Sequence, residues 1–266
     1  LGIPADRIEL RYNDSAAPKM LGTGSFGSRS LISHGAALQT AAKEIVEKGK
    51  KLAASELEVA PGDVVFEAGT YKVAGTDLKV TLQSLIERKW SEPTNPLDTN
   101  TTIDLASAFP SGAHIAEVEI DPDTGELAVL NYIAAGDCGT IYNHKLVEGQ
   151  LHGGLMQGLG QVIGEHIAYD HDTGQLLSGS FMDYFMPRAA DLPPITLIDC
   201  AVPSPANVLG AKGAGEAGAT GSVPALANAV MDALKAAGVR HLEMPYSPDR
   251  IWEAIHGAQT TAKAAE

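Results

Sequence analysis

The chain has 266 residues, of which 44% are hydrophobic and 20% are charged, which is typical of globular proteins and excludes disordered and fibrous classes. Its 19 Lys and Arg residues against 33 Asp and Glu residues give a formal net charge of −14, which argues against nucleic acid and anionic membranes as partners. The two cysteines, Cys138 and Cys200, have neither zinc-site nor disulfide-framework spacing, so we expect a reducing, cytoplasmic location.

In the first part of the chain, local patterns predict a strand at Ile8 to Leu10, a helix from Ser33 to Leu52 and a hairpin over residues 64–73. A short helix from Leu82 to Arg88 and a polar connection over residues 89–108 follow. A glycine-rich loop over residues 22–30 precedes the first of these helices. The mixture of strands and helices, continued in the second part, predicts an α+β fold.

The second part begins with a hairpin between Ala113 and Tyr132, and a second hairpin is expected around the turn at residues 170–174. Both turns have the pattern Asp-x-Asp-x-Gly, but neither has the downstream glutamate of a calcium loop in register, so we interpret them as plain turns. Later elements are an extended loop over 181–196, a strand from Ile195 to Val202, a helix from Ser222 to Gly238 with the serine as its N-cap, and a tail that frays from Ala258.

A glycine-rich helix is expected between the two turns, around residues 147–161. Its apolar stripe and its glutamines lie on different faces: Leu151, Leu155, Leu159 and Val162 against Gln150, Gln157 and Gln161. Each glycine weakens such a helix by about 1 kcal/mol relative to alanine, which the close approach of another backbone or of a ligand would explain.

Two glycine-rich loops each lead into a helix, and helix N-termini are natural seats for anions. The first, residues 22–30, also offers serine hydroxyls and Arg29, but it matches neither nucleotide-binding fingerprint, so an anion site and an ordinary turn both stay open. In the second, residues 210–221, Glu216 either complements the helix dipole or faces a bulky group among the glycines. Lys212 could pair with Glu216 or be solvated. The histidines have no metal spacing, and we expect Cys138 to be a small buried residue.

Six segments, in order along the chain, resemble the molybdenum-binding large subunit of the xanthine dehydrogenase, aldehyde oxidase and carbon monoxide dehydrogenase family, in its bacterial three-subunit branch. They are Gly24–Ser30, Asp137–Gly139 with Asn143, Val147–Gln150 with His152–Gly154, Gln157–Gly160, Gly179–Tyr184 with Pro187–Asp191, and Gly210–Gly218. The resemblance covers nearly the whole chain. It implies a molybdenum hydroxylase with a molybdopterin cofactor, carried in the bacterial branch as the cytosine dinucleotide.

By matching position, the resemblance implies that one set of residues binds the cofactor and its phosphates: Phe26, Gly27, Ser28, Arg29, Ser30, Gln150, Gln157, Lys212 and Gly215. Glu216 would be the catalytic base, which we expect to be buried beside the metal. It would accept a proton as water-derived oxygen is inserted at the C–H of an aldehyde or N-heterocycle and hydride passes to the molybdenum centre, while purines, aldehydes, N-heterocycles and carbon monoxide all stay open as substrates. No side chain of this chain is assigned as a metal ligand.

Large subunits of this family are about three times as long, so the resemblance implies that residues 1–266 are a C-terminal cofactor-binding region, with two sub-lobes at about 1–105 and 106–266. FAD and [2Fe-2S] clusters would lie on other subunits or domains, because this chain lacks the cysteines for clusters. The expected partners are the remainder of the large subunit, the iron–sulfur and flavin subunits and a small-molecule substrate, with no nucleic acid and no membrane. The alternative is a non-catalytic fragment that keeps the fold but binds no cofactor alone.

Overall fold

The computed structural model describes residues 1–11, 24–89, 95–191 and 193–265. Two compact units divide the chain: the first takes residues 1–25 and 30–105, and the second takes residues 26–29 and 106–266. The two sub-lobes expected at about 1–105 and 106–266 stay a prediction. Residues 26–29 belong to the second unit although the residues before and after them belong to the first, which the sequence does not predict.

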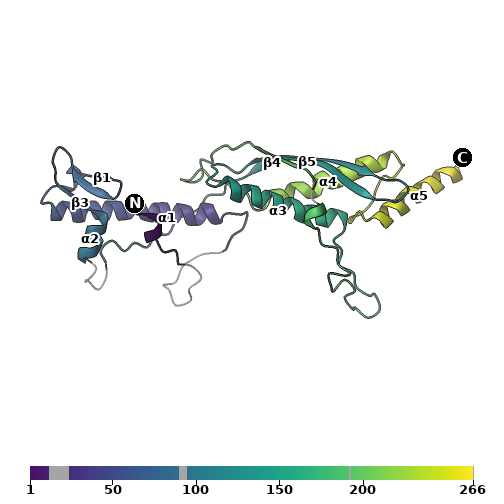
Figure 1. The fold of residues 1–266 in the computed structure, drawn as a ribbon, viewed down its shortest axis with the longest axis horizontal. Helices are drawn as coiled ribbons and strands as arrows, with labels where there is room; N and C mark the ends of the chain where they lie inside the picture. Colours follow the sequence, from purple (N-terminus) through teal and green to yellow (C-terminus); the bar gives the residue numbers. More distant parts are fainter. Residues whose placement is uncertain (12–23, 90–94, 192, 266) are drawn as a thin grey trace. The chain divides into compact units, whose positions relative to one another are not determined.

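A long helix and a small antiparallel sheet make up most of the first unit (Figure 1). Its elements are α1 (Ser30–Glu56), β1 (Val64–Glu67), β2 (Thr70–Val73), β3 (Lys79–Thr81) and α2 (Leu82–Lys89), with the sheet order β1-β2-β3. Tyr71 is fully buried in its core, and its hydroxyl donates to the carbonyl oxygen of Val46 at 3.3 Å. The predicted hairpin and both helices are confirmed, whereas β3 and the longer extent of α1 are not predicted.

The predicted strand at Ile8 to Leu10 is wrong. The structure has a 3-10 turn at Ala5–Arg7, and residues 8–11 have no regular secondary structure. The side chains of Ile8 and Leu10 are 60% and 71% exposed, so this segment has no buried face to hold it in an extended pairing. Short apolar stretches carry too little local information to fix a strand when no sheet edge receives them.

The second unit is built on a three-stranded sheet with the order β4-β5-β6, in which β4 and β5 are antiparallel and β5 and β6 are parallel. Its elements are β4 (Ser111–Ile120), β5 (Leu127–Asp137), α3 (His144–Ile163), β6 (Ile195–Asp199), α4 (Ala217–Lys235) and α5 (Pro248–Ala265). The Asp121 carboxylate accepts from the amide of Asp123 at 2.8 Å, and Asp170 accepts from the amide of Thr173 at 2.8 Å. Both predicted turns are therefore held by their own first aspartate.

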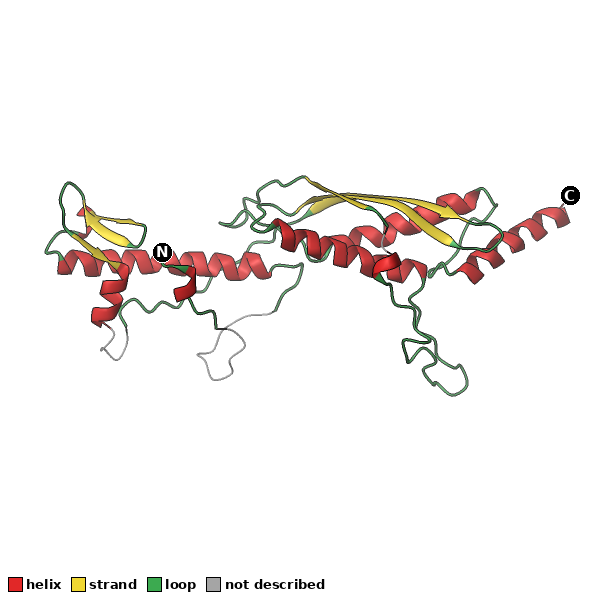
Figure 2. Ribbon diagram, viewed as in Figure 1, coloured by secondary structure: helices red, strands yellow, loops and turns green. Residues whose placement is uncertain are grey.

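Helices α3 and α4 lie side by side against one face of this sheet (Figure 2). The apolar residues of β4 and β5 that alternate toward this face pack on buried residues of both helices, including Leu155, Leu159, Leu226 and Val230. The predicted apolar stripe of α3 is thus confirmed, and the exposed glutamines Gln150 and Gln157 lie on its other side.

The start of α4 corrects the sequence prediction. The helix begins at Ala217, five residues before the expected N-cap Ser222, which is fully buried inside the helix. Its first turns pack on α3 through glycine: a Cβ added at Gly218 would lie 2.9 Å from the Cα of Gly154. Close packing of two helix backbones outweighs the low helix propensity of the glycines, which is why local sequence alone places the start too late.

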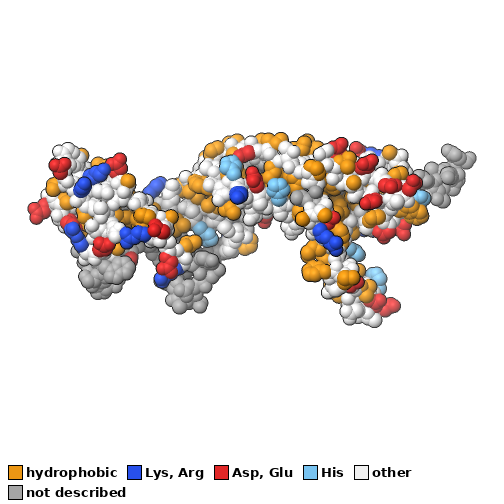
Figure 3. Space-filling view, in the orientation of Figure 1, with side chains coloured by type: hydrophobic (Ala, Val, Ile, Leu, Met, Phe, Trp, Pro, Cys, Tyr) orange, Lys and Arg blue, Asp and Glu red, His pale blue; other side chains and the backbone are white. Residues whose placement is uncertain are grey.

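The segment between α3 and β6 runs away from the sheet and helices and carries exposed apolar side chains, among them Phe181 at 77% and Met182 at 93% exposure (Figures 1 and 3). The predicted second hairpin forms only as a turn: a single bridge joins Tyr169 and Leu176, and the described residues of this segment contain no strand. Helix α5 continues to Ala265, and the fraying expected from Ala258 stays a prediction. Among the described helices, none has both the length and the apolar character needed to cross a bilayer.

Candidate cofactor-binding site

The loop over residues 26–29 is a tight turn with two consecutive left-handed residues. Gly27 has φ of 60° and Ser28 has φ of 56°. This conformation costs a non-glycine residue about 1–2 kcal/mol, so surrounding contacts must hold Ser28 in place. The guanidinium carbon of Arg29 lies 5.2 Å from the centroid of the Phe26 ring, within range of a cation–π interaction. Helix α1 begins immediately afterwards, at Ser30.

The contacts that hold Ser28 come from the second glycine-rich loop, about 185 positions further along the chain. A Cβ at Gly213 would overlap the carbonyl oxygen of Gly27 and lie 3.1 Å from the Cβ of Ser28. A Cβ at Gly215 would lie 2.9 Å from Oγ of Ser28 and 3.2 Å from Oε1 of Gln150. The two loops therefore meet, and only glycine permits an approach this close at both positions.

Glu216 directly follows this contact and is the N-cap residue of α4. Its backbone has φ of −96° and ψ of −13°, and its side chain makes no capping hydrogen bond to the helix. No ion pair to this carboxylate occurs among the residues that the structure describes. The side chain is exposed, so the expectation that Glu216 is buried is wrong for this chain: the first turn of the helix opens onto a cavity rather than into the core.

The cavity has a volume of about 290 Å³ and lies between the sheet, α3 and the start of α4. The side chains that line it include carboxylates, imidazoles and apolar groups, among them Glu216, Glu148, Asp199, His114, His144 and Ile198. It lies wholly within the second unit. The carboxylate of Glu216 can thus meet a small molecule in this cavity while its own backbone adjoins the loop at residues 26–29.

His114 closes one side of the cavity. Its Nδ1 lies 2.7 Å from the hydroxyl of Tyr132, and the two rings meet edge to face at 5.7 Å. Burial lowers the pKa of His114 and raises that of Tyr132, so both groups are neutral at pH 7. A Cβ at Gly221 would overlap the His114 ring. This pair fixes the position of both rings, and the sequence has no signal that identifies Tyr132 as the partner of His114.

Lys212 is neither paired with Glu216 nor solvated, which are the two environments that the sequence leaves open. Its ammonium forms an ion pair with Oδ2 of Asp137, not with Glu216, and both side chains are only 13% exposed. Burial raises the pKa of Asp137, but the hydrogen bonds from Lys212 and from the amides of Val202 and Gly139 outweigh this and hold the pKa below its ordinary value. The sequence does not indicate this pair, because Asp137 and Lys212 are 75 positions apart.

Cys138, expected to be small and buried, is half-buried and lines the cavity. Burial raises the pKa of its thiol, and the nearby carboxylates of Asp199 and Asp137 raise it further, which favours the unreactive thiol form. Gln150 reaches the loop contact at Gly215, whereas Gln157 lies two turns further along the same exposed face of α3, about 10 Å away along the axis. The structure thus brings Ser28, Gln150 and Gly215 together and leaves Gln157 apart from them.

The residues around the loop contact suit a large anionic group with polar ring edges. Oγ of Ser28 and Oε1 of Gln150 both face the position where a side chain on Gly215 would lie, and open space surrounds the position of a Cβ on Gly27. Amide, hydroxyl and guanidinium groups bind phosphates and the polar edge of a pterin without a protein ligand to the metal. The donor set fits a molybdopterin cofactor, for which it provides hydrogen bonds rather than metal ligands.

Comparisons with known proteins identify the family of the chain. The family model described as "Molybdopterin cofactor-binding domain" matches residues 1–193. The chain is 37% identical over 262 residues to the carbon monoxide dehydrogenase large chain of Hydrogenophaga pseudoflava, which covers 96% of this chain and 32% of that protein. The crystal structure of the Cu,Mo-CO dehydrogenase in its carbon monoxide reduced state matches with a TM-score of 0.78 and 34% identity, over 92% of this chain and 31% of that chain. Quinoline 2-oxidoreductase from Pseudomonas putida 86 matches with a TM-score of 0.75 and 33% identity, over 89% and 31% of the two chains.

These matches define the class of the protein as a molybdopterin cofactor-binding domain with an α+β fold. The chain belongs to the xanthine dehydrogenase, aldehyde oxidase and carbon monoxide dehydrogenase family, in which it corresponds to the molybdenum-binding large subunit. It spans about a third of the length of the relatives that it matches.

Proposed function

We propose that this chain holds a molybdenum–molybdopterin cofactor, in the cytosine dinucleotide form, as part of the large subunit of a hydroxylase-type oxidoreductase. The observation that carries the proposal is the meeting of residues 26–29 with Gly213 and Gly215, directly before Glu216. Two loops that approach so closely form one continuous polar edge, and a single carboxylate follows it. The family membership supplies the nature of the cofactor.

The proposed cofactor contacts follow from this arrangement. Ser28, Arg29 and Ser30 lie where a turn leads into the N-terminus of α1, a favourable position for phosphate oxygens. Phe26, which is 65% exposed, offers its ring, and Gly27 offers its backbone. Gln150 and Gln157, on the exposed face of α3, would donate amide hydrogen bonds to the pterin, and Gly215 would let it approach the main chain.

We assign Glu216 as the general base. When bound, the cofactor supplies the two-electron oxidation and the site at which water-derived oxygen enters the substrate. Glu216 accepts the proton that this oxygen gives up, which requires a carboxylate within hydrogen-bond distance and not committed to another partner. The exposed, uncapped carboxylate at the edge of the cavity meets the second condition among the described residues. General acid–base groups of this kind contribute about 10²- to 10⁴-fold to the rate.

The proposal extends to the whole protein. The substrate class is a small aldehyde or N-heterocycle, supported by the likeness to a quinoline 2-oxidoreductase and by the apolar part of the cavity lining. The partners are the remainder of the large subunit, with FAD and [2Fe-2S] clusters on other subunits or domains. The location is the cytoplasm, as the cysteine content and charge favour.

The first test is Glu216→Gln in the full-length subunit assembled with its partners. The amide keeps the size of the side chain but cannot accept a proton, so turnover is expected to fall by at least about 10²-fold while molybdenum content stays near that of the wild type. Glu253→Gln, an exposed substitution on α5, is the matched control. Unchanged turnover in Glu216→Gln would remove the base assignment.

The second test is Arg29→Ala, measured as molybdopterin content per subunit. Loss of the guanidinium removes a donor at the loop and its stacking on Phe26, so occupancy is expected to fall. Arg240→Ala, at an exposed position of the second unit, is the control for loss of positive charge. Equal occupancy in both variants would contradict the phosphate-binding role. A wild-type protein that is folded but holds no molybdenum would favour the alternative, a non-catalytic module.

A further inference from the structure

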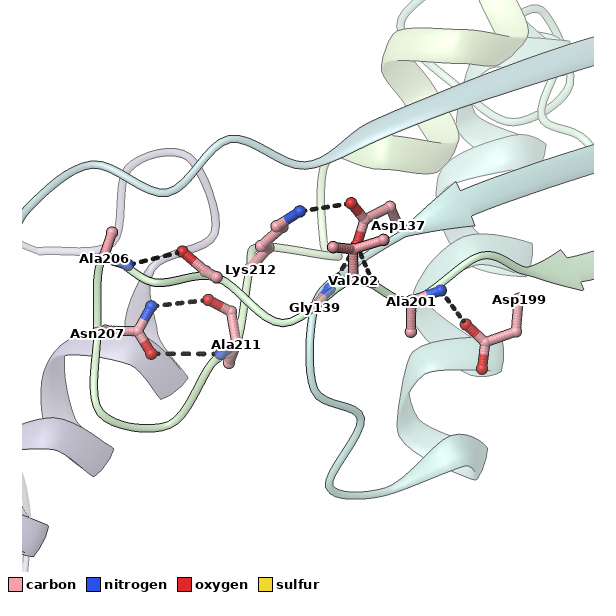
Figure 4. Close-up of polar contacts among 10 residues, drawn as sticks. Asp137, Gly139, Asp199, Ala201, Val202, Ala206, Asn207, Ala211 and Lys212 are labelled. Atoms are coloured by element: carbon pink, nitrogen blue, oxygen red, sulfur yellow. Dashed lines mark hydrogen bonds and ion pairs between the residues drawn. The ribbon is translucent and has the colours of Figure 1, made fainter.

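Three loop segments meet at the part-buried ion pair between Asp137 and Lys212 (Figure 4). Oδ2 of Asp137 accepts from the ammonium of Lys212, while Oδ1 accepts from the amides of Gly139 and Val202, each at 2.9 Å. One carboxylate thus connects the end of β5, the segment after β6 and the loop that precedes α4. We call this group of contacts the loop clamp.

The backbone of the same segments is paired as well. The amide of Lys212 donates to the carbonyl oxygen of Cys138 at 2.8 Å, and the amide of Thr140 donates to that of Gly210 at 2.8 Å. The side chain of Asn207 accepts from the amide of Ala211 at 3.2 Å and donates to its carbonyl oxygen at 2.9 Å. The position of Lys212 is therefore fixed through both its main chain and its side chain.

The loop clamp lies immediately before the short stretch of chain that leads to Glu216. Between Lys212 and Glu216 lie only Gly213, Ala214 and Gly215, and glycines leave a backbone free to move unless it is held at both ends. The far end is held by Gly218, whose backbone packs against α3. The near end is held by the loop clamp.

We propose that Lys212 and Asp137 form a positioning pair, which fixes the near end of this loop so that the Glu216 carboxylate faces the cavity. This inference rests on the proposed function of Glu216 as the base. It reassigns Lys212, which the family resemblance places among the cofactor-binding residues. Turning its ammonium toward a phosphate would leave the part-buried Asp137 carboxylate without its cation and would break a charge-assisted hydrogen bond.

The test uses the full-length subunit assembled with its partners, with the variants Lys212→Met, Lys212→Arg and Asp137→Asn. Misplacing a base by about 1 Å costs on the order of 10²-fold, so Lys212→Met and Asp137→Asn are each expected to lower kcat by roughly 10- to 100-fold with KM nearly unchanged. Lys212→Arg keeps the cation and is expected to recover most of the lost activity. The double variant should lose about as much as either single variant, since both remove one interaction.

Two readouts separate positioning from other roles. Molybdenum and molybdopterin content should stay near the wild-type level in Lys212→Met, whereas a cofactor-binding lysine would lower it as Arg29→Ala does. Hydrogen exchange at the amides of Thr140 and Lys212 should be faster in Lys212→Met and in Asp137→Asn, which is independent of activity. Lys235→Met breaks an exposed ion pair with Asp232, on side chains 72% and 76% exposed, and should change neither readout.

The outcomes also distinguish this inference from the proposed function. Full turnover in Glu216→Gln would overturn the base assignment, whatever Lys212→Met does. If Glu216→Gln is inactive but Lys212→Met keeps full kcat, loses molybdopterin, or leaves amide exchange unchanged, the positioning role is overturned and the base assignment stands. If Lys212→Met does not fold, Asp137→Asn decides the question by the same criteria, because asparagine still accepts from the amides of Gly139 and Val202.

Discussion

Replacing Gly218 by alanine tests the close contact between the backbones of α3 and α4. The added Cβ would lie 2.6 Å from the carbonyl oxygen of Leu151, 2.8 Å from the amide nitrogen of Leu155 and 2.9 Å from the Cα of Gly154. All three are backbone atoms of one helix, so no side chain can rotate away. Non-bonded carbon atoms prefer separations of about 3.5–4 Å, so the two helices must separate by roughly 0.5–1 Å.

The expected cost follows from two opposing effects. Overpacking of this kind costs about 1–3 kcal/mol, and alanine returns about 1 kcal/mol through its higher helix propensity. Because rigid backbone is the obstacle, we expect net destabilisation of about 1–2 kcal/mol. Gly153→Ala is the matched control: it lies in α3, is exposed, and has nothing within 4 Å of its added Cβ. That variant should gain up to about 1 kcal/mol.

Hydrogen exchange at the amides of Leu226 and Val230 reports the free energy of opening of α4 in the second unit. A difference of about 2 kcal/mol between the two variants corresponds to a roughly 30-fold difference in exchange rate, with the faster rate in Gly218→Ala. Equal protection in both variants would show that α3 and α4 do not approach closely at Gly218, and the account of why α4 begins at Ala217 would fail with it.

Two further predictions concern a turn and the loop clamp. Gly125 and Gly174 both have left-handed backbones, with φ of 75° and 72°, but of the two only Gly125 would have a Cβ that overlaps another segment, at Pro248. Gly125→Ala should therefore lower the melting temperature of the second unit more than Gly174→Ala. The reverse order would contradict this contact. The pKa of Asp137 is lower in the folded chain than its ordinary value, so the stabilisation it gives is present at neutral pH and is lost as the pH falls below about 4. The stability of Asp137→Asn, followed by near-ultraviolet circular dichroism, should therefore depend less on pH between about 6 and 3 than that of the wild type. An equal dependence in both proteins would refute this.

Local patterns predict most elements of this fold but not their boundaries. The stripe of Leu155, Leu159 and Val162 is visible because helix periodicity repeats within a few residues, and the structure buries all three. The start of α4 is not visible in the same way. Ser222 is a good N-cap by residue type, yet it is buried because the glycines before it pack on another helix, and that partner is more than 60 positions away.

The candidate site also has features that local sequence predicts and features that depend on distant parts of the chain. Glycine-rich loops before helices indicate anion sites from residue type alone, and this reasoning selects residues 22–30 and 210–221. That the two loops meet comes from the family resemblance, because no periodicity connects positions about 185 apart. The pairing of Lys212 with Asp137 comes from neither source: a part-buried ion pair depends on which loop ends the fold places together, and the one carboxylate within ten positions of Lys212 is Glu216, which is not its partner.

The glycines between positions 210 and 221 have two different physical roles, which explains why so many occur together. Gly213 and Gly215 admit another loop, and Gly218 and Gly221 admit a helix backbone and the His114 ring. Glu216 lies at the junction, with a flexible stretch on one side and a tightly packed helix on the other. A carboxylate in that position has little freedom to move only if both sides are anchored. Removing either anchor, by Lys212→Met or by Gly218→Ala, should therefore displace the same carboxylate, and the two variants should impair turnover in the same way although they lie on opposite sides of it.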